Sequence, residues 1–132
     1  MTGIKIDGKI IAQTVKDRVK KAADELKTEG INPCLATVLI GNNAASATYV
    51  KNKHKSCEEV GIATKDHKLD ESVTQQELNN IIDELNADVS VHGILVQLPL
   101  PKHLNEFATT SRISPIKDVD GLTPHNAGLL AM

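Results

Sequence analysis

The chain has 132 residues, of which 40% are hydrophobic, 24% are charged and only 2% are aromatic, and its formal net charge is −2. This length fits one globular domain, or a piece of a larger protein, with a core of its own. Because the charges nearly balance and aromatic rings are scarce, the composition argues against a nucleic-acid binder and against attraction to an anionic membrane.

Residues 9–29 carry the pattern of an amphipathic helix, after a turn at Asp7-Gly8. Gly30 suits the carboxyl end of that helix. The basic residues between the apolar positions are expected to face solvent. The apolar positions fall at steps of three and four and are Ile10, Ile11, Val15, Val19, Ala22 and Leu26.

Two strands and a helix are expected next. Residues 35–40 form a short β-rich run, and a helix follows from about Ala45 to Val60, where Gly61 stops it. Residues 62–69 are more polar and predict a strand nearer the edge of the sheet. A long helix between such runs favours parallel strands.

The second half repeats this arrangement. Thr74 and Glu77 have the spacing of a capping box. The following helix has a stripe formed by Leu78, Ile81, Ile82 and Leu85, and ends near Asp88. Residues 89–98 predict a third strand, which the prolines at 99 and 101 terminate.

The remaining segments are a short helix at 105–111, a loop at 113–126 and the beginning of a helix at 127–132. The alternation of strands and helices predicts an α/β fold, a three-layer sandwich with a mainly parallel sheet. Cys34 and Cys57 lie among apolar residues and are interpreted as free core thiols. No signal-peptide segment begins the sequence and no apolar run approaches ~20 residues, so a cytoplasmic protein without a membrane span is expected.

Tyr49 and Lys53 stand out because they are four residues apart on a predicted helix and share one of its faces. That helix follows a predicted strand through a Gly-Asn-Asn turn at 41–43. Open α/β sheets bind ligands outside the carboxyl ends of their strands. Residues 97–99 and the loop at 118–121 could reach the same edge, so the site is expected there.

Six segments together resemble a known family. They are DGK at 7–9, VLIG at 38–41, ASATYVKNK at 45–53, CEEVGI at 57–62, GILVQLPLP at 93–101 and KDVDG at 117–121. In this order and spacing they resemble the catalytic domain of the bifunctional methylenetetrahydrofolate dehydrogenase/methenyltetrahydrofolate cyclohydrolase family. The resemblance implies folate one-carbon metabolism: oxidation of 5,10-methylenetetrahydrofolate with NAD(P)+, then hydrolysis to 10-formyltetrahydrofolate.

The resemblance also implies a division of the enzyme into two domains. Family members continue into a nucleotide-binding domain, return a terminal helix to the catalytic domain and form homodimers. This chain has no Gly-x-Gly-x-x-Gly, and Gly41 alone cannot cradle a pyrophosphate. Residues 1–132 are therefore expected to be the catalytic domain of a truncated chain, with NAD(P) bound outside it. We expect hydride transfer to be impossible in this chain alone and hydrolysis to be weak or absent.

Lys53 matches the catalytic lysine of that family. A free lysine has a pKa of about 10.4, so acting as a base near neutral pH requires a drop of ~3 units, roughly 4 kcal/mol. Partial burial and a bound cationic methenyl group would both favour that drop. The alternative is a solvated lysine in the basic run at 51–55.

Further site residues follow from the same resemblance. Tyr49 would contact the aminobenzoyl group of the folate with its ring and would take part in catalysis by offering its hydroxyl to the lysine and water. Gln97 would orient the lysine or the substrate, and Pro99 would shape the wall of the pocket. Ser46 would lie near the substrate at the start of the helix. Each residue also has a purely structural alternative. Tyr49 could be an ordinary half-buried tyrosine and Gln97 a polar residue at a strand end. Pro99 could simply stop the strand, and Ser46 could cap the helix.

Asp120 is the expected recognition residue for the pterin ring. The pterin edge presents a ring N–H beside an exocyclic amine, and one carboxylate can accept both. The alternative is a turn aspartate that caps its own loop. Asp118 is expected to hold that loop. Too few acidic ligands surround the pair for an EF-hand, and the five histidines lack zinc spacing, so no metal is expected.

Two other functions remain open. One is a folate-binding module without turnover. The other is a nucleic-acid binder that uses the basic run at 51–55 with Lys16, Lys20 and Lys21. The negative net charge and the scarcity of aromatic residues argue against this function.

Overall fold

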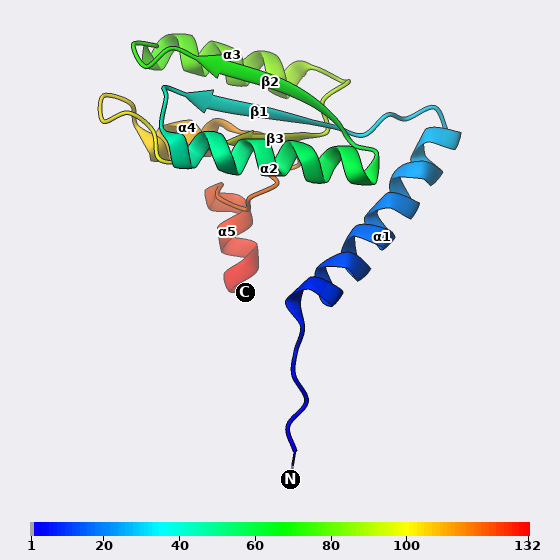
Figure 1. Cartoon of the computed structure of the whole chain (residues 1–132). Helices are drawn as coiled ribbons and strands as arrows, with labels where there is room; N and C mark the ends of the chain where they lie inside the picture. Colours follow the sequence, from blue (N-terminus) through cyan, green and yellow to red (C-terminus); the bar gives the residue numbers. More distant parts are fainter. Residues whose placement is uncertain (1) are drawn as a thin grey trace.

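A computed structural model describes residues 2–132 and has three parallel strands with helices on both faces (Figure 1). The strands are β1 (Cys34–Ile40), β2 (Ala63–Leu69) and β3 (Gly93–Val96), in the spatial order β2-β1-β3. The predicted three-layer α/β fold with a parallel sheet is confirmed. The polar strand β2 lies at one edge, as its composition indicated.

Helix α2 (Ala44–Val60) packs against β1 and β2 on one face of the sheet. The side chain of Asn43 caps its first turn by accepting a hydrogen bond from the backbone N–H of Ser46. Gly61 ends the helix in the left-handed conformation, at φ 80°, which glycine adopts without steric cost. Ser46 is therefore not the helix cap that the sequence left open as an alternative.

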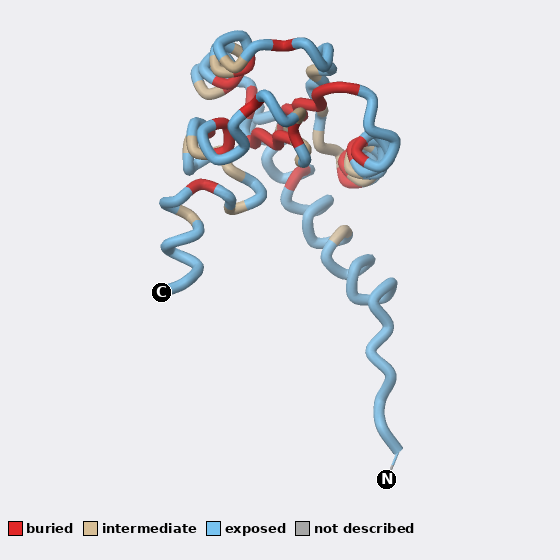
Figure 2. The backbone as a smooth tube through the Cα atoms, turned by 90° about the vertical axis from the view of Figure 1, so that its left-hand side faces the viewer, coloured by how far each residue is buried: buried red, intermediate tan, exposed pale blue. Residues whose placement is uncertain are grey.

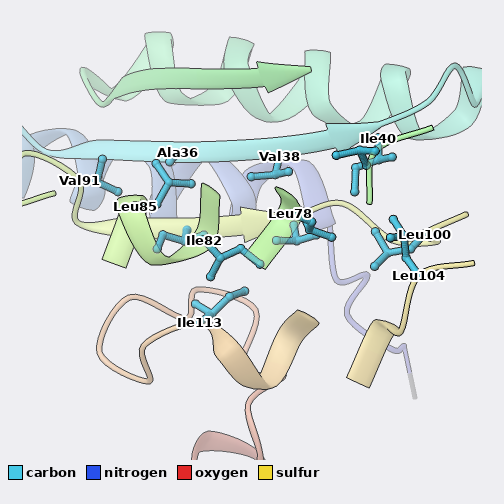
Figure 3. Packing of buried hydrophobic residues seen from close by; sticks show 13 residues of the cluster. Ala36, Val38, Ile40, Leu78, Ile82, Leu85, Val91, Leu100, Leu104 and Ile113 are labelled. Carbon is cyan, nitrogen blue, oxygen red and sulfur yellow. The ribbon is translucent and has the colours of Figure 1, made fainter. Parts of the chain in front are cut away.

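The hydrophobic core lies on the other face, under α3 (Gln75–Ala87) and α4 (Glu106–Arg112) (Figure 3). Alternate residues of a strand point to opposite faces, so Ala36, Val38 and Ile40 of β1 face this core. The predicted capping box of Thr74 and Glu77 begins α3, with both of its hydrogen bonds formed. The core residues that α3 contributes are Leu78, Ile82 and Leu85.

Helix α1 (Gly8–Thr28) forms as the periodicity predicted, but its apolar side is largely exposed. It extends away from the sheet, and Figure 2 shows almost all of its length as exposed. Ile10 is 66% exposed, and Ala23 is the one buried residue of this helix. Periodicity predicts which residues share a face, but it does not say what covers that face.

Two boundaries differ from the sequence predictions. Strand β3 is four residues long rather than spanning 89–98, because Asp88 accepts hydrogen bonds from the backbone and hydroxyl of Ser90 and holds the chain in a turn. Helix α5 (Pro124–Ala131) begins inside the stretch that was predicted as loop. Thr123 caps it and Pro124 occupies its first position, where a missing N–H costs nothing.

None of the helices within residues 2–132 has both the length and the apolar composition needed to cross a membrane.

Candidate active site

A cavity of about 460 Å³ lies between α2 and the loop at 118–120. Its apolar residues include Leu35 of β1 and Leu95 of β3, which are on the sheet face that α2 only partly covers. The lining is formed by Leu35, Tyr49, Asn52, Lys53, Ser56, Cys57, Leu95, Val119 and Asp120.

The cavity extends beyond the strand ends where the sequence predicted the site. The site was expected outside the carboxyl ends of the strands, but Leu35 is near the amino end of β1, where it pairs with Gly93. The cavity therefore runs along the face of the sheet rather than across its edge. The reason is that α2 packs over β1 and β2, so β3 keeps an open flank on that side.

One face of α2 supplies five of the lining side chains. Tyr49, Asn52, Lys53, Ser56 and Cys57 follow the spacing i, i+3, i+4, i+7 and i+8, which places them in one stripe along a helix. The sequence analysis chose only Tyr49 and Lys53 from this stripe. Asn52 lies between these two on the same stripe, and extending the spacing by one turn would have identified Ser56 and Cys57.

Lys53 is half-buried, and its Nζ donates a hydrogen bond of 3.0 Å to Oε1 of Gln97. Gln97 follows the last residue of β3, and its own Nε2 donates to the carbonyl of Leu98 at 3.0 Å. The amide is therefore held at both ends. An ammonium group has three donors, so two remain for a ligand or water.

The loop that carries Asp120 is held by its neighbour Asp118. The carboxylate of Asp118 accepts hydrogen bonds from the backbone of Leu122 and Thr123 and from Nδ2 of Asn126. Burial opposes ionisation of Asp118, but these bonds outweigh it and hold its pKa below the ordinary value. The predicted role of Asp118 as the residue that holds the loop agrees with these contacts, and Asp120 remains exposed beside the cavity.

The other predicted site residues lie in different environments. Tyr49 is 60% exposed, so its ring is accessible from the cavity and is not a core residue. Ser46 is buried in the first turn of α2, and Pro99 is exposed two residues after Gln97. Neither of them lines the cavity. The structure thus brings together Tyr49, Lys53 and Asp120 directly, with Gln97 joined through the lysine.

Cys57 is the one thiol in the lining. Burial raises its pKa, and nearby Cys34 raises it further, so the thiol stays protonated at neutral pH and is a poor nucleophile. Both cysteines are free and buried, as the sequence indicated. In residues 2–132, no three or more side chains of His, Cys, Asp or Glu are grouped so that they could hold a metal ion.

The turn between β1 and α2 does not fit a dinucleotide. Gly41, at φ 78°, is its single glycine, and the side chain of Glu71 lies against it, 3.7 Å from where a Cβ would be. A carboxylate beside this turn repels a pyrophosphate, which binds where backbone N–H groups and positive charge converge. The residues of this turn therefore do not supply a nicotinamide nucleotide site.

A parallel α/β sheet with an open flank, on which an amine, a phenol and a carboxylate face one partly apolar cavity, is the arrangement of a small-molecule enzyme site. The family model described as tetrahydrofolate dehydrogenase/cyclohydrolase, catalytic domain, matches residues 6–120. The chain belongs to this family.

Individual relatives agree with this assignment. The chain is 78% identical over 132 residues to the bifunctional protein FolD of Nitrosopumilus maritimus, covering all of this chain and 46% of that protein. It is 51% identical over 127 residues to the FolD protein of Moorella thermoacetica, covering 96% of this chain and 45% of the relative. The chain thus spans about half the length of the curated relatives it matches.

Solved structures share the fold. The crystal structure of the FolD methylenetetrahydrofolate dehydrogenase/cyclohydrolase from Campylobacter jejuni superposes with a TM-score of 0.92 at 49% identity, covering 94% of this chain and 44% of that one. The Trypanosoma brucei dehydrogenase-cyclohydrolase, complexed with NADP and an inhibitor, gives a TM-score of 0.92 at 34% identity, covering 100% and 46% of the two chains.

Proposed function

We propose that residues 1–132 are the folate-binding catalytic domain of an enzyme of one-carbon metabolism. The enzyme oxidises 5,10-methylenetetrahydrofolate with NAD(P)+ and hydrolyses the methenyl product to 10-formyltetrahydrofolate. The observation that carries the proposal is that Tyr49, Lys53 and Asp120, from segments far apart in sequence, line one cavity. Family membership supports the same reading.

Recognition of the folate is divided between two residues at the cavity. The Asp120 carboxylate accepts hydrogen bonds from the ring N–H and the exocyclic amine of the pterin, a paired geometry that one carboxylate satisfies. The exposed ring of Tyr49 stacks on the aminobenzoyl group. Ser46 and Pro99 do not line the cavity, so their predicted contacts with the substrate stay predictions.

Hydrolysis requires water at an electrophilic carbon and a proton at a ring nitrogen. The oxygen of water bonds to the methenyl carbon and loses a proton, and the bond from that carbon to one ring nitrogen then breaks as the nitrogen gains a proton. Lys53 is the group that moves the proton, since it is the basic side chain of the cavity. Gln97 holds its Nζ in place through the 3.0 Å hydrogen bond.

The hydride acceptor NAD(P) binds outside this chain, because the turn around Gly41 does not suit a pyrophosphate. No metal takes part in the proposal. We further propose that the enzyme acts in the cytoplasm, where its two free cysteines stay reduced, and that it forms a homodimer.

A second candidate is a folate-binding module without turnover. The 60% exposure of Tyr49 favours it, because an open cavity does not exclude water from the reacting groups. Methenyltetrahydrofolate hydrolysis by the 132-residue chain, measured against buffer, separates the two functions. A rate equal to that of buffer, with tight folate binding, supports the binding module for the chain by itself.

The catalytic role of Lys53 is tested in a chimaera in which this chain is joined to the unmatched remainder of its Nitrosopumilus relative. Lys53→Met should lower the cyclohydrolase rate by roughly 10²–10⁴-fold, the usual contribution of a positioned acid or base. Lys55→Met, at an exposed position of the same helix, is the matched control and should keep the rate. Full activity of Lys53→Met would refute the proposed role.

A further inference from the structure

Strand β3 begins at a glycine because another side chain occupies the space beside it. A Cβ placed on Gly93 would lie 2.6 Å from Cγ1 of Val119 and 3.3 Å from Cδ1 of Leu35. The residues with positive φ are glycines at other positions, so the backbone conformation does not demand glycine here. What demands it is the close approach of Val119 to the sheet.

Val119 cannot easily move out of the way of a larger residue. Its side chain branches at Cβ, so its χ1 angle is restricted and the branch is not the far end of a flexible chain. Leu35 can give way more easily, because its contact atom is terminal. A methyl group at residue 93 therefore displaces the backbone or the rotamer of Val119.

The residues before Val119 are fixed to the sheet. The backbone N–H of Ile94 donates to the carbonyl of Lys117 at 2.8 Å, and Asp118 forms a β-bridge with Ile94. The carboxylate of Asp118 is also held by the turn that follows, through Thr123 N at 2.9 Å. Residues 117–118 are thus held to β3, and the turn at Thr123 is held to Asp118. A displacement of Val119 is therefore taken up by the unrestrained residue next to it, which is Asp120.

We propose that Gly93 is a positioning residue for Asp120: the missing side chain at residue 93 lets Val119 lie directly against the sheet, and this places the Asp120 carboxylate across the cavity from Lys53. The proposal rests on the proposed function, because it gives Asp120 the task of binding the pterin. Val119, Asp120 and Lys53 all line the same cavity, so a shift of the loop changes the shape of the site itself.

The first experiment measures tetrahydrofolate affinity of the 132-residue chain by calorimetry, in anaerobic buffer. Gly93→Ala should weaken binding roughly tenfold or more, the usual effect of losing a charge-assisted hydrogen bond. Gly128→Ala is the matched control, because a Cβ there meets nothing within 4 Å and the residue lies in α5 without positive φ. It should leave the affinity unchanged.

Double variants separate positioning from a general loss of stability. In the Val119→Ala background the contact that Gly93 accommodates is already lost, so adding Gly93→Ala should change the affinity less than about threefold. Asp120→Asn should weaken binding about tenfold in the wild-type chain and much less in Gly93→Ala, where the carboxylate is already misplaced. A purely structural role of Gly93 would leave the cost of Asp120→Asn the same in both.

The outcomes of these measurements distinguish failure of the positioning proposal from failure of the proposed function. Equal effects of Gly93→Ala in the two backgrounds, or an unchanged affinity of Gly93→Ala, overturn the proposal. If Gly93→Ala does not fold, Val119→Ala decides, since the proposal requires Asp120→Asn to cost less there than in the wild-type chain. If the wild-type chain does not bind tetrahydrofolate and Asp120→Asn changes nothing, the proposed function fails, and the positioning proposal, which rests on it, falls with it. If wild-type binding depends on Asp120 but not on Gly93, the positioning proposal alone fails.

Discussion

The amine of Lys53 donates a hydrogen bond of 3.0 Å to the side-chain oxygen of Gln97, 44 positions further along the chain. This contact joins the middle of α2 to the end of β3 and holds the amine beside the cavity. The acceptor is neutral, so the lysine is oriented without being paired to a carboxylate that would favour its charged form.

Replacing the Gln97 amide by a carboxylate tests whether the acceptor of the Lys53 hydrogen bond has to be neutral. In the chimaera, Gln97→Glu should lower the rate of hydrolysis near pH 7 about tenfold, because a charge-assisted hydrogen bond to a carboxylate ties up the Lys53 amine more strongly than the neutral amide does. Gln97→Leu, which has no charge and no acceptor, leaves the amine unoriented and should also lower the rate. An unchanged rate in Gln97→Glu would contradict the role of Lys53 in proton transfer.

Substrate fragments can separate the proposed tasks of Tyr49 and Asp120. Tyr49→Ala should weaken binding of p-aminobenzoylglutamate roughly tenfold, since loss of aromatic stacking costs about 1–3 kcal/mol, and should spare a tetrahydropterin. Asp120→Asn should have the opposite pattern. Ligand-observed NMR titration measures both affinities, and a variant that weakens both fragments equally would show that the assignment of the two halves is wrong.

Acid should release the loop at 118–123. The pKa of Asp118 is lowered in the folded protein, so its contribution to stability is present above its unfolded pKa of about 3.9 and is lost as pH falls through the lower folded value. At pH 7, Asp118→Asn should be less stable to urea than the wild-type chain. Below about pH 4 the difference should shrink. A difference that stays constant from pH 7 to pH 2.5 would rule out this linkage.

Two substitutions in similar sequence patterns should have different costs. Leu78 of α3 is fully buried, so Leu78→Ala should lower the free energy of unfolding by roughly 2–5 kcal/mol. Ile10 also lies in an apolar helical stripe but is 66% exposed, so Ile10→Ala should change it by less than about 0.5 kcal/mol. Urea unfolding of the 132-residue chain measures both, and similar costs would mean that α1 is packed in solution.

Local features of this protein follow from neighbouring residues alone. The capping box at Thr74 and Glu77, the stop at Gly61 and the period of α1 depend on contacts within a few positions, and all three were predicted correctly. The spacing of Tyr49 and Lys53 likewise placed both on one helix face, because that face is set by the 3.6-residue turn.

Only the tertiary structure decided where that face points. The cavity extends along the flank of β3 as far as Leu35, near the amino end of β1, because α2 packs over β1 and β2. The sequence pattern also could not predict the contact of Val119 with Gly93 or the exposure of α1. Periodicity records which side chains share a face, whereas what each face meets depends on the packing of segments distant in the chain.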